Sequence, residues 1–313
     1  HKPVREQKDI TGHAVRAMYL CTGMAEVARE TGDESLMQAC RTLFDSVVNR
    51  TMYVTGALGS NESYERFSFD YHLPNDTVYG ETCAAIGLVF FARSMLTLEK
   101  KAVYADVMER CLYNGVISGM SLDGKSFFYV NPLEVWPEAV AKVPNLYQHV
   151  ALPRQKWFGC ACCPPNLARL VASLGKYTYD YNGDTLYVHL YVGGAIDCGM
   201  VHMDVDSRLP WEGRVTFNLS AENEELDLAL RIPAWCQGQF TITLNGKTLP
   251  SEIGEDGYAH IRRTWGEADE IAVEFAMPVL VLRSHPALRE NVGKAALQRG
   301  PVVYRAQGGE GPQ

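Results

Sequence analysis

The change from helix to strand falls within residues 166–192, which read NLARLVASLGKYTYDYNGDTLYVHLYV. A double proline precedes this stretch, and because proline is tolerated in the first helical turn, a helix is predicted from Asn166 to about Tyr179. From 186 to 192 apolar residues alternate with others, which indicates a half-buried strand. The alternation recurs at 215–219, 226–232, 240–245 and 270–275. Short strands of this kind predict a β-sandwich, and Asn245-Gly246 predicts a hairpin turn within it.

The residues before 180 have helical spacing instead. A helix is predicted over 11–31, with Thr11 as its N-cap and Gly32 as its stop. Further helices are predicted at 33–49, 81–99 and 102–118, and a hairpin arm at 127–130. The polar connection from 53 to 80 is too long and irregular for one element, and such loops are usually functional. The expected fold is therefore mainly α and then β.

Composition excludes several classes of protein. The chain has 313 residues and a net charge of −8, and it has neither a basic tract nor a long apolar run. Nucleic acid and membranes are therefore not expected as partners. Nine cysteines, an odd number in a chain of this length, argue against a disulfide framework and for free thiols or a metal site. Free thiols favour a cytoplasmic location, with a periplasmic or secreted one left open.

Three of the cysteines lie in the segment Cys160-Ala161-Cys162-Cys163-Pro164-Pro165, directly before the predicted helix. A helix N-terminus stabilises anions, so thiolates at Cys162 and Cys163 would be favoured there. Cysteines inside helices more often act as small hydrophobic residues. The clustered cysteines instead suggest a metal site or a reactive thiol.

A zinc site needs four nitrogen, oxygen or sulfur ligands, and the cysteine segment alone supplies too few. Glu81 and Cys83 stand at the start of another predicted helix and could complete the set. Taken alone, Glu81 would complement the helix dipole and Cys83 would be a core residue. A reactive thiolate would also need an acid, for which Glu65 in the long loop is the candidate, although alone it would be read as a solvated loop residue.

Five stretches give the chain a resemblance to a known family. They are HKPVREQ at 1–7, GHAVRAMY at 12–19, MYVTGALG at 52–59, FDYHLPNDTVYGETCAAIG at 69–87 and CACCPPN at 160–166. The chain resembles the zinc-dependent β-L-arabinofuranosidases of glycoside hydrolase family 127 and the related family 146. The resemblance implies an (α/α)6 barrel followed by β-sandwich domains, and a retaining mechanism that releases L-arabinose.

The resemblance also implies roles for individual residues. Cys162 matches the nucleophile and Glu65 the general acid/base. The zinc ligands would be Glu81, Cys83, Cys162 and Cys163. His13 and Tyr129 match residues that line the sugar pocket, and Cys160 lies beside the site. The implied partner is an arabinose-containing oligosaccharide or glycoconjugate.

The resemblance implies three regions. Residues 1–180 would be the C-terminal half of the catalytic barrel, 181–283 a β-sandwich, and 284–313 the truncated start of a further sandwich. The residue pattern at 295–304 predicts one further β element whose partners lie outside the chain. Residues 308–313 have the composition of a disordered tail. Because the chain begins at His1 without a methionine and has too few helices for a barrel, we expect residues upstream.

Two other classes stay open. A non-catalytic carbohydrate-binding protein with a purely structural zinc would have the same ligand set, although the presence of Glu65 speaks against it. A thiol redox enzyme would need CxxC spacing and a βαβ context, and the chain has neither around Cys160 and Cys162. The oligomeric state is not determined by the sequence, and a homodimer is one alternative.

Overall fold

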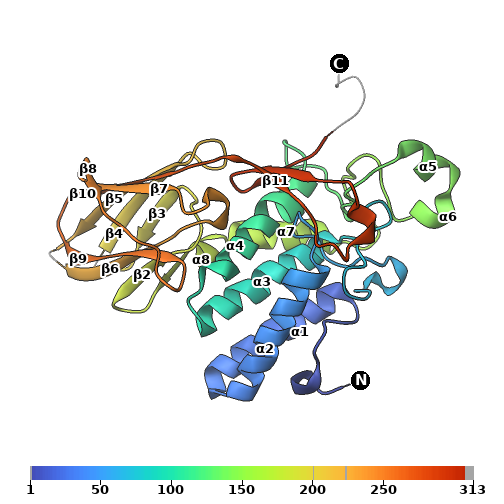
Figure 1. Ribbon diagram of the computed structural model, residues 1–313, viewed down its shortest axis with the longest axis horizontal. Helices are drawn as coiled ribbons and strands as arrows, with labels where there is room; N and C mark the ends of the chain where they lie inside the picture. Colours follow the sequence, from blue (N-terminus) through green and yellow to red (C-terminus); the bar gives the residue numbers. More distant parts are fainter. Residues whose placement is uncertain (1, 200, 223, 307–313) are drawn as a thin grey trace.

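The computed structural model describes residues 2–199, 201–222 and 224–306. A helical part is followed by a β part, whose strands within residues 179–275 lie at the opposite end of the molecule from the helices, whereas its last strands, within residues 279–304, lie alongside the helices (Figure 1). The helices are α1 (Ala14–Thr31), α2 (Glu34–Ser46), α3 (Thr82–Leu98), α4 (Ala102–Arg110), α5 (Pro137–Lys142), α6 (Pro144–Tyr147), α7 (Cys163–Ala172) and α8 (Gly175–Thr178). No helix in these ranges is both long and apolar enough to cross a membrane.

Helix α3 is the centre of the helical part, and almost all of its side chains are buried. It packs against α1, α4 and α7, and its mean hydropathy is accordingly high for a helix of a globular protein. The contact with α1 is especially close at Gly87, where an added Cβ would lie 2.8 Å from Cβ of Met18. Only glycine allows the two helix backbones to approach this far.

The helix ends follow from local chemistry. Helix α1 begins after His13, so the predicted N-cap Thr11 is wrong by two residues, whereas the predicted stop is confirmed because Gly32 is left-handed with φ of 66°. Asp33 caps α2 and accepts a hydrogen bond from the backbone N–H of Leu36 at 3.0 Å. The helix predicted over 102–118 is regular only to Arg110 and continues as a π-helical turn at 111–116.

Two sheets form the β-sandwich. One sheet has the order β1-β2-β6-β9 and the other β3-β4-β5-β10-β7-β8, and all neighbours are antiparallel except β2 and β6. Alternate residues of each strand face the core between the sheets, where Phe217 pairs with Ile271 and Trp265 is fully buried. The strands are β1 (Tyr179–Tyr181), β2 (Thr185–Val188), β3 (Gly194–Asp197), β4 (Val201–Ser207), β5 (Arg214–Ala221), β6 (Glu224–Arg231), β7 (Phe240–Leu244), β8 (Lys247–Leu249), β9 (Tyr258–Trp265) and β10 (Asp269–Phe275).

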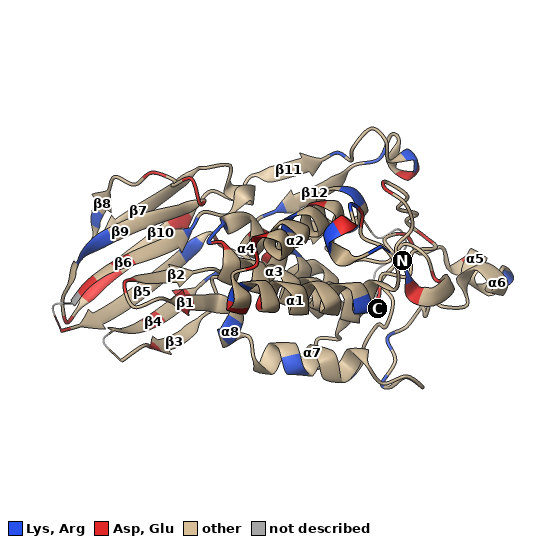
Figure 2. Ribbon diagram, turned by 90° about the horizontal axis from the view of Figure 1, so that it is seen from below, with Lys and Arg blue, Asp and Glu red and all other residues tan. Residues whose placement is uncertain are grey.

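The predicted hairpin at Asn245-Gly246 is confirmed, since both residues have positive φ and Leu244 pairs with Lys247. The strand predicted at 186–192 ends early, at Val188. The backbone N–H of His189 bonds to the carbonyl of Thr178 at 2.8 Å, which takes the chain out of the sheet. Figure 2 shows strands whose charged residues are of one sign: β9 carries Arg262 and Arg263, and β10 carries Asp269, Glu270 and Glu274.

A third sheet follows the sandwich. Its strands are β11 (Val279–Leu282), β12 (Ala296–Arg299) and β13 (Val302–Tyr304). β12 pairs with β11 on one side and β13 on the other, so the expectation that its partners lie outside the chain is wrong. β11 precedes residue 284 and supplies the missing partner. The tail predicted at 308–313 lies outside the described residues, and the domain boundaries at 180 and 283 stay predictions.

A buried ion cluster joins the helical part to the sandwich. The guanidinium of Arg231, on β6, has no exposed surface and contacts the carboxylates of Asp106 and Glu109 on α4. Its Nε donates to the carbonyl of His189 at 2.6 Å, and Trp235 Nε1 donates to Glu109 at 2.8 Å. The sandwich is thereby fixed against a helix that packs on α3.

Candidate active site and metal-binding group

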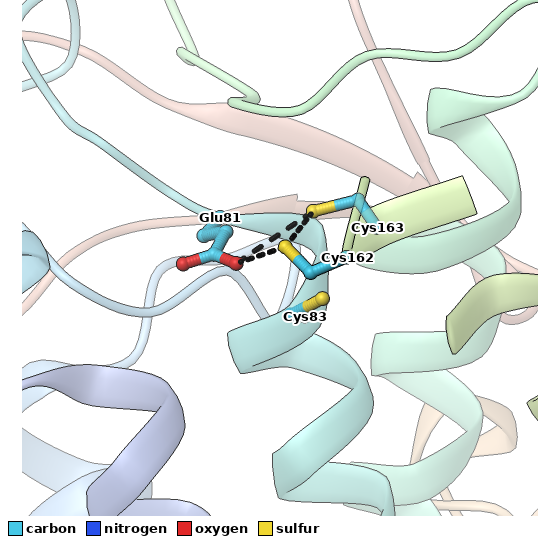
Figure 3. Close-up of side chains that lie close together, drawn as sticks. All are labelled: Glu81, Cys83, Cys162 and Cys163. Carbon is cyan, nitrogen blue, oxygen red and sulfur yellow. Dashed lines mark hydrogen bonds between the residues drawn. The ribbon is translucent and has the colours of Figure 1, made fainter. Parts of the chain in front are cut away.

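The starts of α3 and α7 lie side by side and form the centre of the site (Figure 3). Glu81 immediately precedes α3, and Cys162 immediately precedes α7. Sγ of Cys162 lies 3.3 Å from Oε1 of Glu81 and 3.6 Å from Sγ of Cys163. Sγ of Cys163 lies 3.6 Å from the same Glu81 oxygen. Two helix N-termini therefore bring acidic and thiol groups to one point.

Cys83 completes a group of four. One ligand atom from each of Glu81, Cys83, Cys162 and Cys163 lies within 4.8 Å of every other, and all but Cys162 are buried. Oε2 of Glu81 is buried and has no hydrogen-bond partner among the residues described. Burial raises the pKa of Glu81 to about 8, and the charge of Cys162 adds to this effect. A bound cation would remove both penalties, so these four residues could hold a metal ion.

The negative charge of the thiol cluster is concentrated on Cys162. Hydrogen bonds from the thiols of Cys163 and Cys83 hold the pKa of Cys162 well below its usual range. The Tyr129 hydroxyl, 2.9 Å from Sγ of Cys162, lowers that pKa further. The pKa of Cys163 is raised, because its proton is shared with Cys162. Cys162 is therefore the sulfur best prepared to act as a nucleophile.

Glu65 is fixed from two sides. Its Oε2 lies 2.7 Å from Nε2 of His13, and its Oε1 accepts a hydrogen bond from the Tyr79 hydroxyl at 2.9 Å. His13 is the N-cap residue of α1, so one end of this helix is tied to the loop that carries Glu65. Of the aromatic residues near Glu65 in sequence, Tyr64 is 80% exposed, and the ring that contacts the carboxylate is that of Tyr79. The carboxylate thus has a defined direction.

Tyr129 connects the thiols to the adjoining chain. Its hydroxyl lies 3.8 Å from Sγ of the exposed Cys160, and its ring packs edge-on against Phe158. Its backbone carbonyl accepts from the N–H of Thr82 at 2.9 Å, at the first turn of α3. The segment predicted as a hairpin arm forms isolated bridges instead of a strand: Phe127 pairs with Met120 and Gln155, and Val130 pairs with Glu81. These bridges place Tyr129 beside the metal-binding group.

One cavity of about 540 Å³ unites these groups. Every residue that the sequence suggested for the site lines it, except Cys163, which lies behind Cys162. A partly exposed thiol, a positioned carboxylate and a group able to bind metal therefore face a single space large enough for a small sugar.

Two sequence models match the chain. The β-L-arabinofuranosidase GH127 catalytic domain matches residues 1–176, and the GH127 middle domain matches residues 185–277. The chain belongs to glycoside hydrolase family 127. A curated relative, the non-reducing end β-L-arabinofuranosidase of Bifidobacterium longum subsp. longum, is 42% identical over 99% of this chain and 48% of its own length. The chain thus spans about half the length of that relative.

Solved structures of the family agree with this fold. The crystal structure of a GH127 β-L-arabinofuranosidase from Geobacillus stearothermophilus T6 has a TM-score of 0.92 and 53% identity, covering 97% of this chain and 48% of the other. A second GH127 β-arabinofuranosidase has a TM-score of 0.89 and 37% identity over 97% of this chain and 49% of its own. The expected fold class, part of an (α/α)6 barrel followed by a β-sandwich, is confirmed.

The cavity also contains residues that were not expected from the sequence. Arg16, Tyr19, Asn166 and Arg169 line the cavity, and Tyr79 holds Glu65. Helical spacing could have indicated the first four, because residues three apart share a helix face and each pair is three apart on α1 or α7. Tyr79 stands two residues before Glu81, but Gly80 between them has φ of 53°, so the segment is not extended and spacing gave no signal for Tyr79.

Proposed function

We propose that this protein is a retaining glycoside hydrolase that releases L-arabinose from the non-reducing end of β-L-arabinofuranosides. Cys162 would be the nucleophile and Glu65 the general acid/base, and the substrate an arabinose-containing oligosaccharide or glycoconjugate. The observation that carries the proposal is the single cavity onto which the Cys162 sulfur and the fixed Glu65 carboxylate both open. The name of the Bifidobacterium relative supports the choice of sugar.

The donor set supports zinc as the metal. In a tetrahedral zinc site, with Zn–S of about 2.3 Å and Zn–O of about 2.1 Å, ligand atoms lie roughly 3.6–3.8 Å apart. The sulfurs of Cys162 and Cys163 are 3.6 Å apart, and Oε1 of Glu81 lies 3.3 and 3.6 Å from them. Thiolates also favour zinc over magnesium or calcium, which bind oxygen. Glu81, Cys83, Cys162 and Cys163 would hold the ion.

In the first step, Cys162 attacks the anomeric carbon while the bond to the leaving oxygen breaks and protonated Glu65 gives its proton to that oxygen. A thioglycosyl bond to Cys162 results. Glu65, now a carboxylate, takes a proton from water as the water attacks the same carbon and the sulfur departs. Each of the two steps inverts the configuration at the anomeric carbon, so the released sugar retains its original configuration. Bound zinc would keep the sulfur deprotonated and make it a better leaving group.

Neighbouring residues of the chain orient both reacting groups. The Tyr129 hydroxyl lies 2.9 Å from the Cys162 sulfur and would donate to it once the sulfur is a thiolate, which fixes its direction. His13 and Tyr79 each hold one oxygen of Glu65, so the carboxylate can turn little between its two roles. Positioning of this kind accounts for a large share of enzymatic rate enhancement.

A second candidate is a non-catalytic carbohydrate-binding protein. The four-ligand set has no free position, which is typical of structural zinc sites. In that case Cys162 would only hold metal, and replacing Glu65 would leave sugar binding intact. The two candidates therefore differ in turnover and in the effect of Glu65.

The test is hydrolysis by the full-length protein of an alkyl and a nitrophenyl β-L-arabinofuranoside. Cys162→Ser should abolish turnover of both. Glu65→Gln should lower turnover of the alkyl substrate by about 10²–10⁴-fold and that of the nitrophenyl substrate less, because nitrophenolate leaves without a proton. Glu62→Gln, on the same loop, is the matched control and should leave both rates unchanged.

Proton NMR of the first-formed product should find the β-anomer of L-arabinose. Retained turnover in Cys162→Ser or in Glu65→Gln with the alkyl substrate would contradict the assigned roles. Sugar binding without turnover by the wild type would favour the second candidate.

A further inference from the structure

A second group of ligand atoms lies in the same cavity. One ligand atom from each of His13, Glu65 and Glu81 lies within 4.8 Å of the other two. His13 Nε2 and Glu65 Oε2 are 2.7 Å apart. The group shares Glu81 with the thiol cluster but contains no sulfur. Its chemistry therefore differs from that of the four-residue group.

The thiol group accounts for only one of the two oxygens of Glu81. Oε1 faces the sulfurs of Cys162 and Cys163, at 3.3 and 3.6 Å. Oε2 is buried and has no hydrogen-bond partner in the part of the chain that the structure describes. The residue is only 3% exposed, so water cannot readily take the place of a partner. A buried carboxylate oxygen in this state is costly and points to a bound cation or proton donor.

The three ligands suit a divalent transition ion. An imidazole nitrogen and two carboxylate oxygens bind zinc at about 2.0–2.2 Å, which separates neighbouring ligand atoms by roughly 3–3.5 Å. His13 Nε2 and Glu65 Oε2 are slightly closer together than two ligand atoms of one ion would be. Small movements of the two side chains would therefore open enough space for an ion between them. The adjoining cavity leaves room for water ligands. Without thiolates, the site would be weaker than the thiol group.

We propose that His13, Glu65 and Glu81 form a second, inhibitory zinc site that fills only when zinc is in excess. Glu81 then bridges two ions, one on each of its oxygens. The inhibition rests on the function proposed above. A Glu65 oxygen bound to an ion cannot carry the proton for the leaving group, and an ion between His13 and Glu65 occupies space that the sugar needs. Excess zinc therefore competes with the arabinoside.

The first measurement does not depend on activity. The full-length protein is dialysed against a series of free zinc concentrations, and bound metal is counted by atomic emission. Wild type should bind a first equivalent tightly and a second more weakly. His13→Gln and Glu65→Gln should each lose only the second equivalent. His202→Gln removes an exposed histidine that lies 3.5 Å from Asp204, and should keep both equivalents.

The second measurement is kinetic. At a free zinc concentration ten times the dissociation constant of the weaker equivalent, the apparent KM for the arabinoside should rise about elevenfold with kcat unchanged, as expected for competition. His202→Gln should respond to zinc as wild type does. Inhibition that lowers kcat and leaves KM unchanged would overturn the competition.

The outcomes separate this inference from the proposed function. A single equivalent in the wild type at every zinc concentration, or a second equivalent that survives in both His13→Gln and Glu65→Gln, refutes the second site while leaving hydrolysis untouched. A second equivalent that depends on His13 and Glu65 in a protein that hydrolyses no arabinoside supports the site and refutes the function.

Discussion

Replacing Arg231 by methionine should destabilise the protein far more than the same replacement of another sandwich arginine. Arg231→Met leaves the Glu109 carboxylate, in a residue only 3% exposed, without its cation. Asp106 loses the same partner. Breaking a buried ion pair in this way costs about 3–5 kcal/mol, because the remaining charge stays buried and uncompensated. Methionine retains the aliphatic stem, so little of this cost comes from a cavity.

The matched control is Arg262→Met on the adjacent strand β9. Arg262 is half exposed and pairs with Asp184 at 2.8 Å at the surface. Exposed pairs contribute about 0–1 kcal/mol, so this variant should unfold almost as the wild type does. Both variants lose one positive charge, and a difference between them therefore measures burial and not net charge.

The assay is urea unfolding followed by tryptophan fluorescence, which reports on the sandwich through the buried Trp235 and Trp265. The free energy of unfolding should fall by about 3–5 kcal/mol in Arg231→Met and by under about 1 kcal/mol in Arg262→Met. Adding Glu109→Gln to Arg231→Met should recover part of the loss, because it removes one stranded charge. Equal stabilities for the two single variants would refute the reasoning.

Two further predictions concern stability. Burial opposes a charge on His260, but hydrogen bonds from its ring to Asp227 and Asp256 raise its pKa. The stabilisation lost in His260→Gln should therefore be greatest below about pH 6.5 and should fade as the pH rises through the folded-state pKa; a difference from wild type that is constant with pH would contradict this. Gly23→Ala, in an open position on α1, should raise the free energy of unfolding by about 0.5–1 kcal/mol. Gly87→Ala should lower the free energy of unfolding by about 1–3 kcal/mol, since the added methyl group enters the close contact between α3 and α1. If both glycine variants were more stable than the wild type, the two helices would have moved apart to accommodate the methyl group.

Periodicity detects strands whose buried positions are large and regularly spaced, although β4, with Val201, Met203 and Val205 buried, has this pattern and was not among the predicted strands. β5 and β10 alternate cleanly, and their apolar residues meet in the core. β3 and β8 are short edge strands with mainly exposed residues, so burial leaves no pattern in their sequences. β9 alternates in the structure, but its buried Ala259 is too small to mark the period. The alternation of apolar residues in a sequence reflects which side chains are buried. It therefore reveals a strand only where one face of that strand is buried.

The site could be predicted as two helix starts but not as one place. Local rules put Glu81 and Cys83 at one N-terminus and Cys162 and Cys163 at another, and the structure has them there. That the two ends touch depends on the packing of α7 against α3, for which no local pattern exists. The pairing could be suggested because a zinc site needs four ligands, and the resemblance to the family supported it, but no local pattern in the sequence required it.

The position of Glu65 is fixed by backbone that local propensity disfavours. Tyr64 and Glu65 have φ of 62° and 51°, a region that non-glycine residues occupy at a cost of about 1–3 kcal/mol each. Reciprocal backbone hydrogen bonds between Asn61 and Arg66, at 3.1 and 3.0 Å, close the loop, and Phe67 N–H bonds to the Gly12 carbonyl next to α1. Glycine would adopt these angles freely, but it would also let the loop move. The strain is sustained by contacts with the α1 N-terminus, so the helix that supplies His13 also sets the direction of the proposed proton donor.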